Sequence, residues 1–296
     1  MSAHPTTPKI ARAGAPAPPL TTARSFLFVP ATRPERIDKA LASATDLVIV
    51  DLEDAVAPAD KERARSQLSA WLEAHPTASV LVRINGAGTA WHAADLAACR
   101  QRGVAGLLLP KAESAAEIDE AWRSSGKPVL PIVETGRGID ALDEIARAPG
   151  TARLVFGKLD LAVDLDLTPD ESDPEELVFL PYRALLVLAS RRANLPLPVD
   201  GVFTAIADSQ ALARYAGRAR RHGFGAQLLI HPAQAATVAA AFAPAAAEIA
   251  WAKAVIAAAA AAGGGAAVVD GRMIDAPVIA RAERLLAAAA LIPQRH

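Results

Sequence analysis

Cysteine, aromatic residues and an excess charge of either sign are scarce in this sequence. The 296 residues include one cysteine, Cys99, so no internal disulfide can form, and no clustered Cys/His spacing predicts a structural zinc site. The 31 basic and 32 acidic side chains leave a net charge of -1, which gives nucleic acid or an anionic membrane no concentrated positive surface. These absences favour a cytoplasmic protein that acts on a small molecule.

Long hydrophobic runs are missing as well. Residues 1–22 are rich in Pro, Ala and Thr and lack the continuous apolar core of a secretory signal, so we expect a disordered tail there. The alanine-rich run at 256–262 is far shorter than the ~20 apolar residues that span a bilayer. We therefore predict that the protein does not associate with membranes.

What the sequence does contain is a regular alternation of short apolar runs with helical patterns. Near-continuous apolar strands alternating with amphipathic helices predict a parallel sheet covered by helices. Eight such units match a closed (β/α)8 TIM barrel, which we place at 23–243, followed by a C-terminal helical extension at 244–296. An open doubly wound sheet is the alternative, but no GxGxxG follows the first strand. The eight runs are SFLFVP, DLVIVDLED, SVLVRIN, GLLLPKA, PVLPIVET, RLVFGKLD, LPVDGVF and AQLLIHP.

Three of these strands end on charged residues. Arg83, Glu134 and Asp160 close strands three, five and six, and the carboxyl ends of all barrel strands open on one face. Strand alternation turns Glu134 and Asp160 inward and gives Lys158 the same direction as Asp160. Two carboxylates suit Mg2+, which takes one or two such ligands and keeps water and substrate oxygens. Arg83 offers a planar fork for a substrate carboxylate, or forms a salt bridge to one of the acids.

Other charged residues also lie at strand ends. Asp51 and Glu53 share one face of the second strand, where they orient the metal's waters or Arg83, or form an ion pair at the bottom of the barrel. Lys111 and His231 end strands four and eight, where each contacts substrate or closes the rim.

The chain resembles a known family over residues 24–286. It is similar to the citrate lyase β-subunit-like branch of the HpcH/HpaI aldolase superfamily, which includes malyl-, citramalyl- and citryl-CoA lyases. The motifs that carry the resemblance are RSFLFVPATRPE, VIVDLEDAVAPADKERAR, VRING, LPKAES, IVETGRG, FGKLDLAVDL, DGVFT, GFGAQLLIHPAQ and GRMIDAP.

The resemblance implies a Mg2+ site in a (β/α)8 barrel, with Glu134 and Asp160 as metal ligands. It implies that Arg83 grips the carboxylate of a 2-oxo acid, that Arg24 and Arg33 lie near the phosphates of CoA, and that Asp275 reaches the active site of a neighbouring subunit. The expected partners are therefore an acyl-CoA thioester, a 2-oxo acid (oxaloacetate, pyruvate or glyoxylate) and further copies of the chain, as a trimer or hexamer.

The expected activity is Mg2+-dependent carbon–carbon cleavage of a 3-hydroxyacyl-CoA, with Asp275 handling the proton at the thioester α-carbon. One departure from the family pattern opens an alternative, because FGKLD stands where many members read FGAED. A Schiff-base aldolase would use Lys158 as its nucleophile, although nearby acids stabilise the ammonium form. A second alternative is a citrate lyase complex subunit that acts on an acyl carrier protein.

Overall fold

The computed structural model of the chain describes residues 20–169, 176–262 and 267–290. Two compact units make up the chain, Met1–Ala239 and Ala240–His296. The first unit holds the barrel, and the second holds helices and a short pair of strands. The described chain begins at Leu20, which packs against the barrel core three residues before the predicted start of the barrel.

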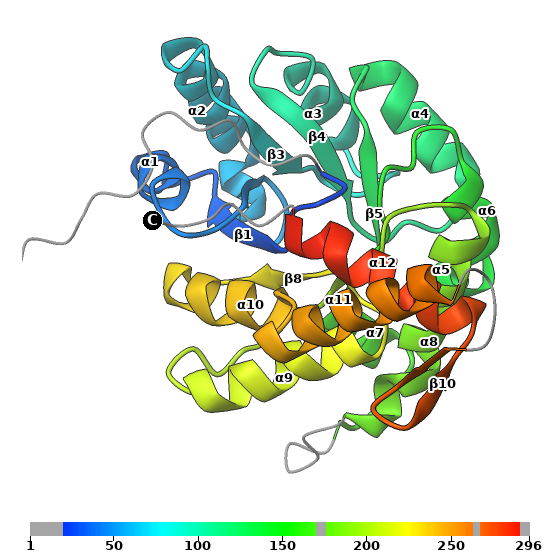
Figure 1. Ribbon diagram of the computed structural model, residues 1–296. Helices are drawn as coiled ribbons and strands as arrows, with labels where there is room; N and C mark the ends of the chain where they lie inside the picture. The colour runs from blue at the N-terminus through cyan, green and yellow to red at the C-terminus, as the bar shows by residue number, and fades with distance from the viewer. Residues whose placement is uncertain (1–19, 170–175, 263–266, 291–296) are drawn as a thin grey trace, which may run out of the picture. The chain divides into compact units, whose positions relative to one another are not determined.

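Eight parallel strands form the first unit and close into a ring, because β1 pairs with both β2 and β8. The prediction of a closed (β/α)8 barrel is confirmed, and Figure 1 shows the ring with helices around it. The strands are β1 (Ser25–Pro30), β2 (Leu47–Asp51), β3 (Val80–Arg83), β4 (Val104–Leu109), β5 (Val129–Val133), β6 (Val155–Phe156), β7 (Val199–Asp200) and β8 (Ala226–Leu229).

Helices connect successive strands, as right-handed parallel crossovers require. Ser114 and Thr135 cap α4 and α5, where each side-chain oxygen accepts from a backbone N–H three residues ahead. The helices that follow β1 to β4 are α1 (Glu35–Leu41), α2 (Lys61–Ala74), α3 (His92–Ala98) and α4 (Ala115–Ser125). Those that follow β5 to β8 are α5 (Gly136–Asp140), α6 (Leu142–Arg147), α7 (Lys158–Asp164), α8 (Leu180–Arg192), α9 (Ser209–Arg221) and α10 (Ala235–Phe242). Short 3-10 turns are η1 (Pro58–Asp60), η2 (Leu177–Phe179) and η3 (Pro232–Gln234).

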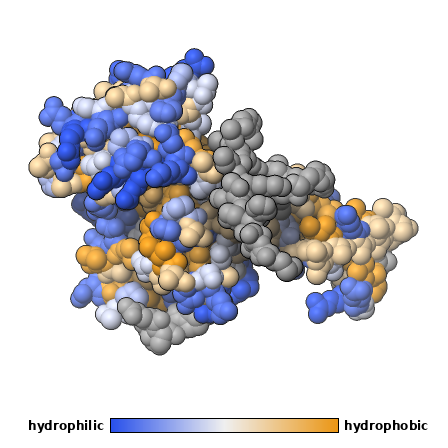
Figure 2. Space-filling view, turned by 90° about the vertical axis from the view of Figure 1, so that its left-hand side faces the viewer, coloured by the Kyte–Doolittle hydropathy of each residue, from blue (hydrophilic) through white to orange (hydrophobic). Residues whose placement is uncertain are grey.

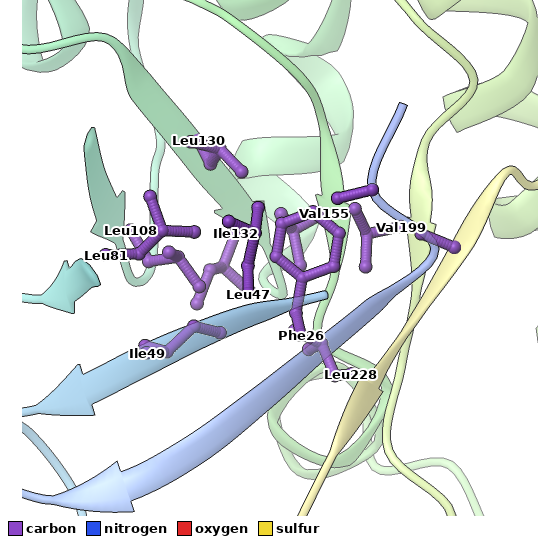
Figure 3. Packing of buried hydrophobic residues seen from close by; sticks show 12 residues of the cluster. Phe26, Leu47, Ile49, Leu81, Leu108, Leu130, Ile132, Val155, Val199 and Leu228 are labelled. Atoms are coloured by element: carbon purple, nitrogen blue, oxygen red, sulfur yellow. The ribbon is translucent and has the colours of Figure 1, made fainter. Parts of the chain in front are cut away.

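The barrel interior is filled with apolar side chains, not solvent. Figure 3 shows Phe26, Leu47, Leu130, Val155 and Leu228 meeting inside the ring. Alternate strand residues supply this core, so the residues between them point outward to the helices. A packed interior leaves the strand ends as the places where polar chemistry can gather.

β1 matches its predicted run, but the other strands are shorter than the apolar runs predicted, and strand six differs most. β6 ends at Phe156, and α7 begins at Lys158. The alternation that placed Lys158 and Asp160 on one strand face is therefore wrong, because side chains two residues apart on a helix diverge.

At the amino ends of the strands, a buried arginine ties three backbone segments together. Arg153 Nε donates to the carbonyl oxygen of Leu197 at 2.6 Å, and its Nη1 donates to those of Leu20 and Ala23 at 3.0 and 2.7 Å. Its guanidinium lies over the ring of Phe26, 5.5 Å from the centroid. Burial lowers the pKa of Arg153 to about 9, so these contacts offset a real desolvation cost.

The second unit consists of α11 (Ala246–Ala261), the antiparallel strands β9 (Ala267–Val269) and β10 (Arg272–Ile274), and α12 (Ala276–Ala290). Asp270 and Gly271 turn the chain between the strands at φ 49° and 73°, as a tight hairpin turn requires. Its small core includes Ala252, Val255 and Ile274. The sequence predicted a helical extension, and the structure adds the hairpin to it.

Within the described residues, one stretch, Pro232–Ala261, is long and apolar enough to cross a membrane by length and composition alone. A single such stretch is weak evidence, because helices of soluble proteins pass the same test, and this one is broken between α10 and α11 at residues 243–245. Figure 2 shows hydrophilic and hydrophobic residues interspersed on the face it displays.

Replacing Arg153 with methionine tests its role in joining these segments. Arg153→Met removes the donors from three carbonyl oxygens, so we expect the free energy of unfolding to fall by about 1 to 3 kcal/mol. Urea denaturation measures this change. Arg123→Met is the control, because Arg123 pairs with Asp119 while 73% exposed, and such surface pairs contribute little. Equal stability of the two variants would contradict the interpretation.

Candidate active site at the carboxyl ends of the barrel strands

Glu134 is a buried carboxylate directly after β5. Its side chain accepts a hydrogen bond from the backbone N–H of Lys111 at 2.9 Å and is 3% exposed. Burial, followed by the nearby charge of Asp160, raises the pKa of Glu134 to about 8. A group held this far from its usual pKa has a strong affinity for a proton or another cation.

Gly157 makes the space that Glu134 occupies. A Cβ atom on Gly157 would lie 2.1 Å from Oε2 of Glu134 and 2.6 Å from its Cβ. Any other residue at this position would have to displace the carboxylate. The glycine after β6 therefore fixes the conformation of the acid that directly follows the neighbouring strand, β5.

Asp160 lies in the first turn of α7, close enough to Glu134 to raise its pKa. The Asp160 side chain is 39% exposed, and its Oδ1 lies 3.2 Å from Nζ of Lys111. The structure thus brings together the two acids that the sequence predicted, although Asp160 comes from a helix and not from a strand.

Arg83 ends β3 and is held by acids at the end of β2 and just after it. Its Nε and Nη2 donate to the two carboxylate oxygens of Asp51 at 2.8 and 2.6 Å, and its Nη1 lies 3.0 Å from Glu53 and 3.3 Å from Asp54. Burial opposes the charged form, but these acids raise the pKa of Arg83. Because Asp51 and Glu53 contact Arg83 at the carboxyl ends of the strands, an ion pair at the bottom of the barrel is excluded.

Lys111 joins the two groups of acids, a role that the sequence left open. Its Nζ lies 3.2 Å from Glu53 Oε1 and 3.2 Å from Asp160 Oδ1. Burial favours the neutral amine, but Glu53, Glu134 and Asp160 raise the pKa of Lys111. The residue adopts φ 49°, an uncommon conformation for a non-glycine residue. This backbone strain turns both its N–H and its amine toward the acids, and no sequence pattern signals it.

Lys61 is a further buried cation beside the site. Its Nζ donates to the carbonyl oxygens of Leu52 and Glu53, each at 2.8 Å. Burial lowers the pKa of Lys61, partly opposed by Glu53 and Asp51. Its bonds to consecutive carbonyls hold the segment that carries Glu53 next to Arg83. Lys61 was not predicted as a site residue, because it lies in a run with helical spacing.

Lys158 does not lie beside Asp160 as predicted. Its Nζ donates to Glu176 Oε1 at 2.5 Å and lies 4.5 Å from the centroid of the Tyr215 ring. Burial lowers the pKa of Lys158, and Glu176 opposes that change. An amine engaged in this way is a poor nucleophile, so the geometry disfavours the Schiff-base alternative.

The two arginines associated with CoA lie at opposite ends of β1. Arg33 lines a cavity of about 490 Å3 together with Arg63, Asp60 and Gln67. Arg24 precedes β1, and its backbone N–H donates to Asp46 at 2.7 Å. The structure therefore does not bring Arg24 and Arg33 together.

Two other predicted residues act as helix caps. His231 precedes η3, and its Nδ1 accepts from the N–H of Ala233 at 3.2 Å. Asp275 belongs to the second unit, is exposed, and accepts from the N–H of Val278 at 3.2 Å at the start of α12. Capping and catalysis are compatible for an exposed carboxylate, so the catalytic role of Asp275 remains a prediction.

Within residues 20–169, 176–262 and 267–290, no three or more His, Cys, Asp or Glu side chains are gathered as a ready-made metal site. Glu134 and Asp160 are a pair, with Lys111 as the cation in contact with Asp160. The carboxyl-terminal end of the barrel, which we call the mouth, therefore carries an acidic pair. This pair and its charged neighbours can bind oxygen-rich, charged groups.

Known proteins share both the sequence and the fold. The HpcH/HpaI aldolase/citrate lyase family model matches residues 24–232. A citrate lyase subunit beta-like protein of Mycobacterium tuberculosis is 38% identical over 263 residues, which cover 88% of this chain and 93% of that protein. A (3S)-malyl-CoA thioesterase of Cereibacter sphaeroides is 36% identical over 275 residues, covering 91% and 95%.

Among solved structures, CitE of Mycobacterium tuberculosis in complex with magnesium, acetoacetate and coenzyme A is 37% identical, with a TM-score of 0.80. The match covers 92% of this chain and 100% of that one. A citrate lyase beta subunit from the same organism, complexed with oxaloacetate and magnesium, is 36% identical with a TM-score of 0.67, and the match covers 76% of this chain and 99% of that one. The sequence resemblance is confirmed: this chain belongs to the HpcH/HpaI aldolase/citrate lyase family, whose members include enzymes.

Proposed function

We propose that the protein is a Mg2+-dependent carbon–carbon lyase that cleaves a 3-hydroxyacyl-CoA, such as citryl-, malyl- or citramalyl-CoA, to an acyl-CoA and a 2-oxo acid. The observation that carries this proposal is the meeting of Glu134, Asp160, Lys111 and Arg83 at one end of the barrel. Relatives whose structures hold magnesium with oxaloacetate, or magnesium with coenzyme A, support it.

The residues at the mouth fit a divalent cation. Carboxylates outnumber the cations that interact with them there. Lys61, Arg83 and Lys111 face Asp51, Glu53, Asp54, Asp95, Glu134 and Asp160, so a divalent cation would offset part of the remaining negative charge. Carboxylate oxygens are the donors that Mg2+ prefers, and a Cβ at Gly157 would fill the place of Glu134. Glu134 and Asp160 are therefore the residues that would hold Mg2+.

Bound Mg2+ would act as a Lewis acid toward the oxygen of the oxo-acid portion. Arg83 and Lys111 would attract the substrate carboxylate, with Arg83 fixed by its fork to Asp51 and Lys111 reaching solvent. In the cleavage direction, the bond between the hydroxyl carbon and the thioester α-carbon breaks. The hydroxyl loses its proton and becomes the carbonyl, and the α-carbon gains a proton.

Asp275 would transfer the proton at the α-carbon. As the family resemblance implies, this Asp275 would come from a neighbouring subunit in a trimer or hexamer. The cavity with Arg33 and Arg63 would take the phosphates of CoA, because guanidinium groups bind phosphate bidentately. We expect a cytoplasmic location for such an enzyme.

A thioesterase is the competing activity, and the relatives from Cereibacter sphaeroides favour it. Hydrolysis would release free CoA and a hydroxy acid, with no carbon–carbon cleavage. A subunit of a citrate lyase complex would instead need an acyl carrier protein, and a citrate lyase subunit beta of Leuconostoc mesenteroides is 31% identical. The three possibilities differ in products or in the substrate carrier.

A thioester panel distinguishes them. We expect malyl-, citramalyl- or citryl-CoA to yield an acyl-CoA and a 2-oxo acid with Mg2+, and to lose this reaction when a chelator is present, because the acidic pair then lacks its cation. Chromatography measures the acyl-CoA, and a thiol reagent measures free CoA. Free thiol without oxo acid would indicate a thioesterase, and activity on carrier-linked substrate alone would indicate a complex subunit.

Gly157→Ala tests the placement of Glu134. The added methyl group would displace the carboxylate, so we expect Mg2+ affinity to fall about 10- to 100-fold, as for other changes around metal ligands. Mn2+ binding and the Mg2+ dependence of the reaction measure the effect. Gly217→Ala is the matched control, because a Cβ there would meet only Arg221 at 3.7 Å. Unchanged Mn2+ affinity in Gly157→Ala would refute the assignment of Glu134.

Arg83→Met tests the pairing with Asp51. It would leave Asp51 buried without its cation, so we expect unfolding free energy to fall by about 3 to 5 kcal/mol and kcat/KM for the thioester to fall with it. Thermal unfolding and steady-state kinetics measure the two effects. In the control, Arg192→Met breaks the exposed pair with Asp143. Wild-type kcat/KM in Arg83→Met would remove Arg83 from the substrate site.

A further inference from the structure

A second buried group of charges lies next to α7 and is not part of the proposed active site. It consists of Lys158, Glu176, Arg183, Asp200, Tyr215 and Arg218, which we call the Glu176 cluster. Asp200 is on β7 next to the core residue Val199, so its side chain points outward to the helices. Arg183 and Arg218 come from α8 and α9 and are at most 1% exposed.

Glu176 is the centre of this cluster. Its Oε1 accepts from Lys158 Nζ at 2.5 Å, and its Oε2 accepts from Arg183 Nη2 at 2.7 Å and from Arg218 Nη2 at 3.0 Å. Glu176 adopts φ 45°, an uncommon conformation that surrounding contacts must stabilise. One carboxylate thus holds cations from three helices.

Lys158 has little freedom in this arrangement. A Cβ on Gly201 would lie 3.2 Å from Lys158 Cγ, so the lysine stem passes close to the backbone after β7. On its other side lies the ring of Tyr215. With the Lys158 amine bound to Glu176, the first residue of α7 is fixed along its whole side chain.

The other end of α7 is fixed to the segment that carries Glu134. Asp164 Oδ2 accepts from the backbone N–H of Gly136 at 2.7 Å, and Gly136 lies two residues after Glu134. The helix is therefore attached at its start to the Glu176 cluster and at its end to the turn after β5. Asp160 lies between these attachments.

Asp160 itself has few contacts that fix it. Among the described residues its ion pair is with Lys111, and its side chain is 39% exposed. The strand before it, β6, has two residues, and α7 has seven. Its position therefore depends on the anchored backbone on either side of it.

We propose that Lys158 and Glu176 are positioning residues that fix the first turn of α7 and thereby hold the Asp160 carboxylate opposite Glu134. The proposal rests on the proposed function, in which Asp160 is a metal ligand. It assigns a purpose to the lysine that departs from the family pattern. The lysine acts through the backbone of α7 and not on the substrate.

Lys158→Met is the informative variant because of the charges of the cluster. Among the described residues, the cluster holds three cations and two carboxylates, so loss of Lys158 leaves two of each, and Glu176 keeps both arginines. Methionine also retains an unbranched stem beside Tyr215. We therefore expect the variant to fold with nearly wild-type thermal stability, while its affinity for Mn2+ falls about 10-fold.

Mn2+ binding, measured by calorimetry and by the resonance signal of free Mn2+, tests the proposal on the full chain. Lys158→Met and Glu176→Asp are both expected to weaken binding, since aspartate keeps its charge near the arginines but withdraws from Lys158. The double variant is expected to be no weaker than the weaker single variant, because both changes break one contact. Arg153→Met is the control, a buried cation lost before β6 rather than after it.

Asp160→Asn separates the possible failures. If the wild type does not bind Mn2+, or if Asp160→Asn binds as well as the wild type, the proposed metal site and this inference both fail. If Asp160→Asn loses binding while Lys158→Met and Glu176→Asp stay within twofold of the wild type, the metal site stands and the positioning role is refuted. If Arg153→Met weakens Mn2+ binding as much as Lys158→Met, the effect is general destabilisation and the inference also fails.

Discussion

The burial of carboxylates gathered at one end of the barrel is the constraint on which the site depends. Burial, and next the charge of Asp160, raises the pKa of Glu134 to about 8, because desolvation and a like charge both disfavour its ionised form. Lys111 offsets part of this negative charge, because its amine lies close to Glu53 and Asp160. Arg83 offsets the charge of the neighbouring acids, and its guanidinium group is bound to Asp51. The cations are held by these acids, of which Asp51 ends β2, Glu134 follows β5 and Asp160 lies in the first turn of α7.

The two ends of the barrel solve the problem of buried charge differently. At the amino ends, Arg153 donates to three backbone carbonyl oxygens and lies over the ring of Phe26, an arrangement that joins segments. At the carboxyl ends, cations face carboxylates instead. The stabilising end is thus separate from the end that carries the proposed site, as is general for barrels of this kind.

Much of the fold and part of the site could be predicted from the sequence. Apolar runs between helical patterns gave eight strands in the right order, and the rule that strand ends share one face brought Arg83, Glu134 and Asp160 together. The side-chain directions after β6 could not be predicted, because the run RLVFGKLD has no capping side chain at Gly157, directly before the helix begins. Lys111 was undervalued because its role depends on a positive φ, which no spacing rule reveals for a lysine.

The contacts of Lys158 show how the fold accommodates a residue that departs from the family pattern. A lysine at the start of α7 would be costly if it were buried without an anion. Glu176 supplies that anion from a segment 18 residues away, and Arg183 and Arg218 bind its second oxygen. Because the amine is neutralised on the helix side of the barrel, no extra positive charge competes for Glu134 and Asp160. In the proposed function, this arrangement leaves the acidic pair to a metal ion, while the bond from Lys158 to Glu176 holds the start of the helix that carries Asp160.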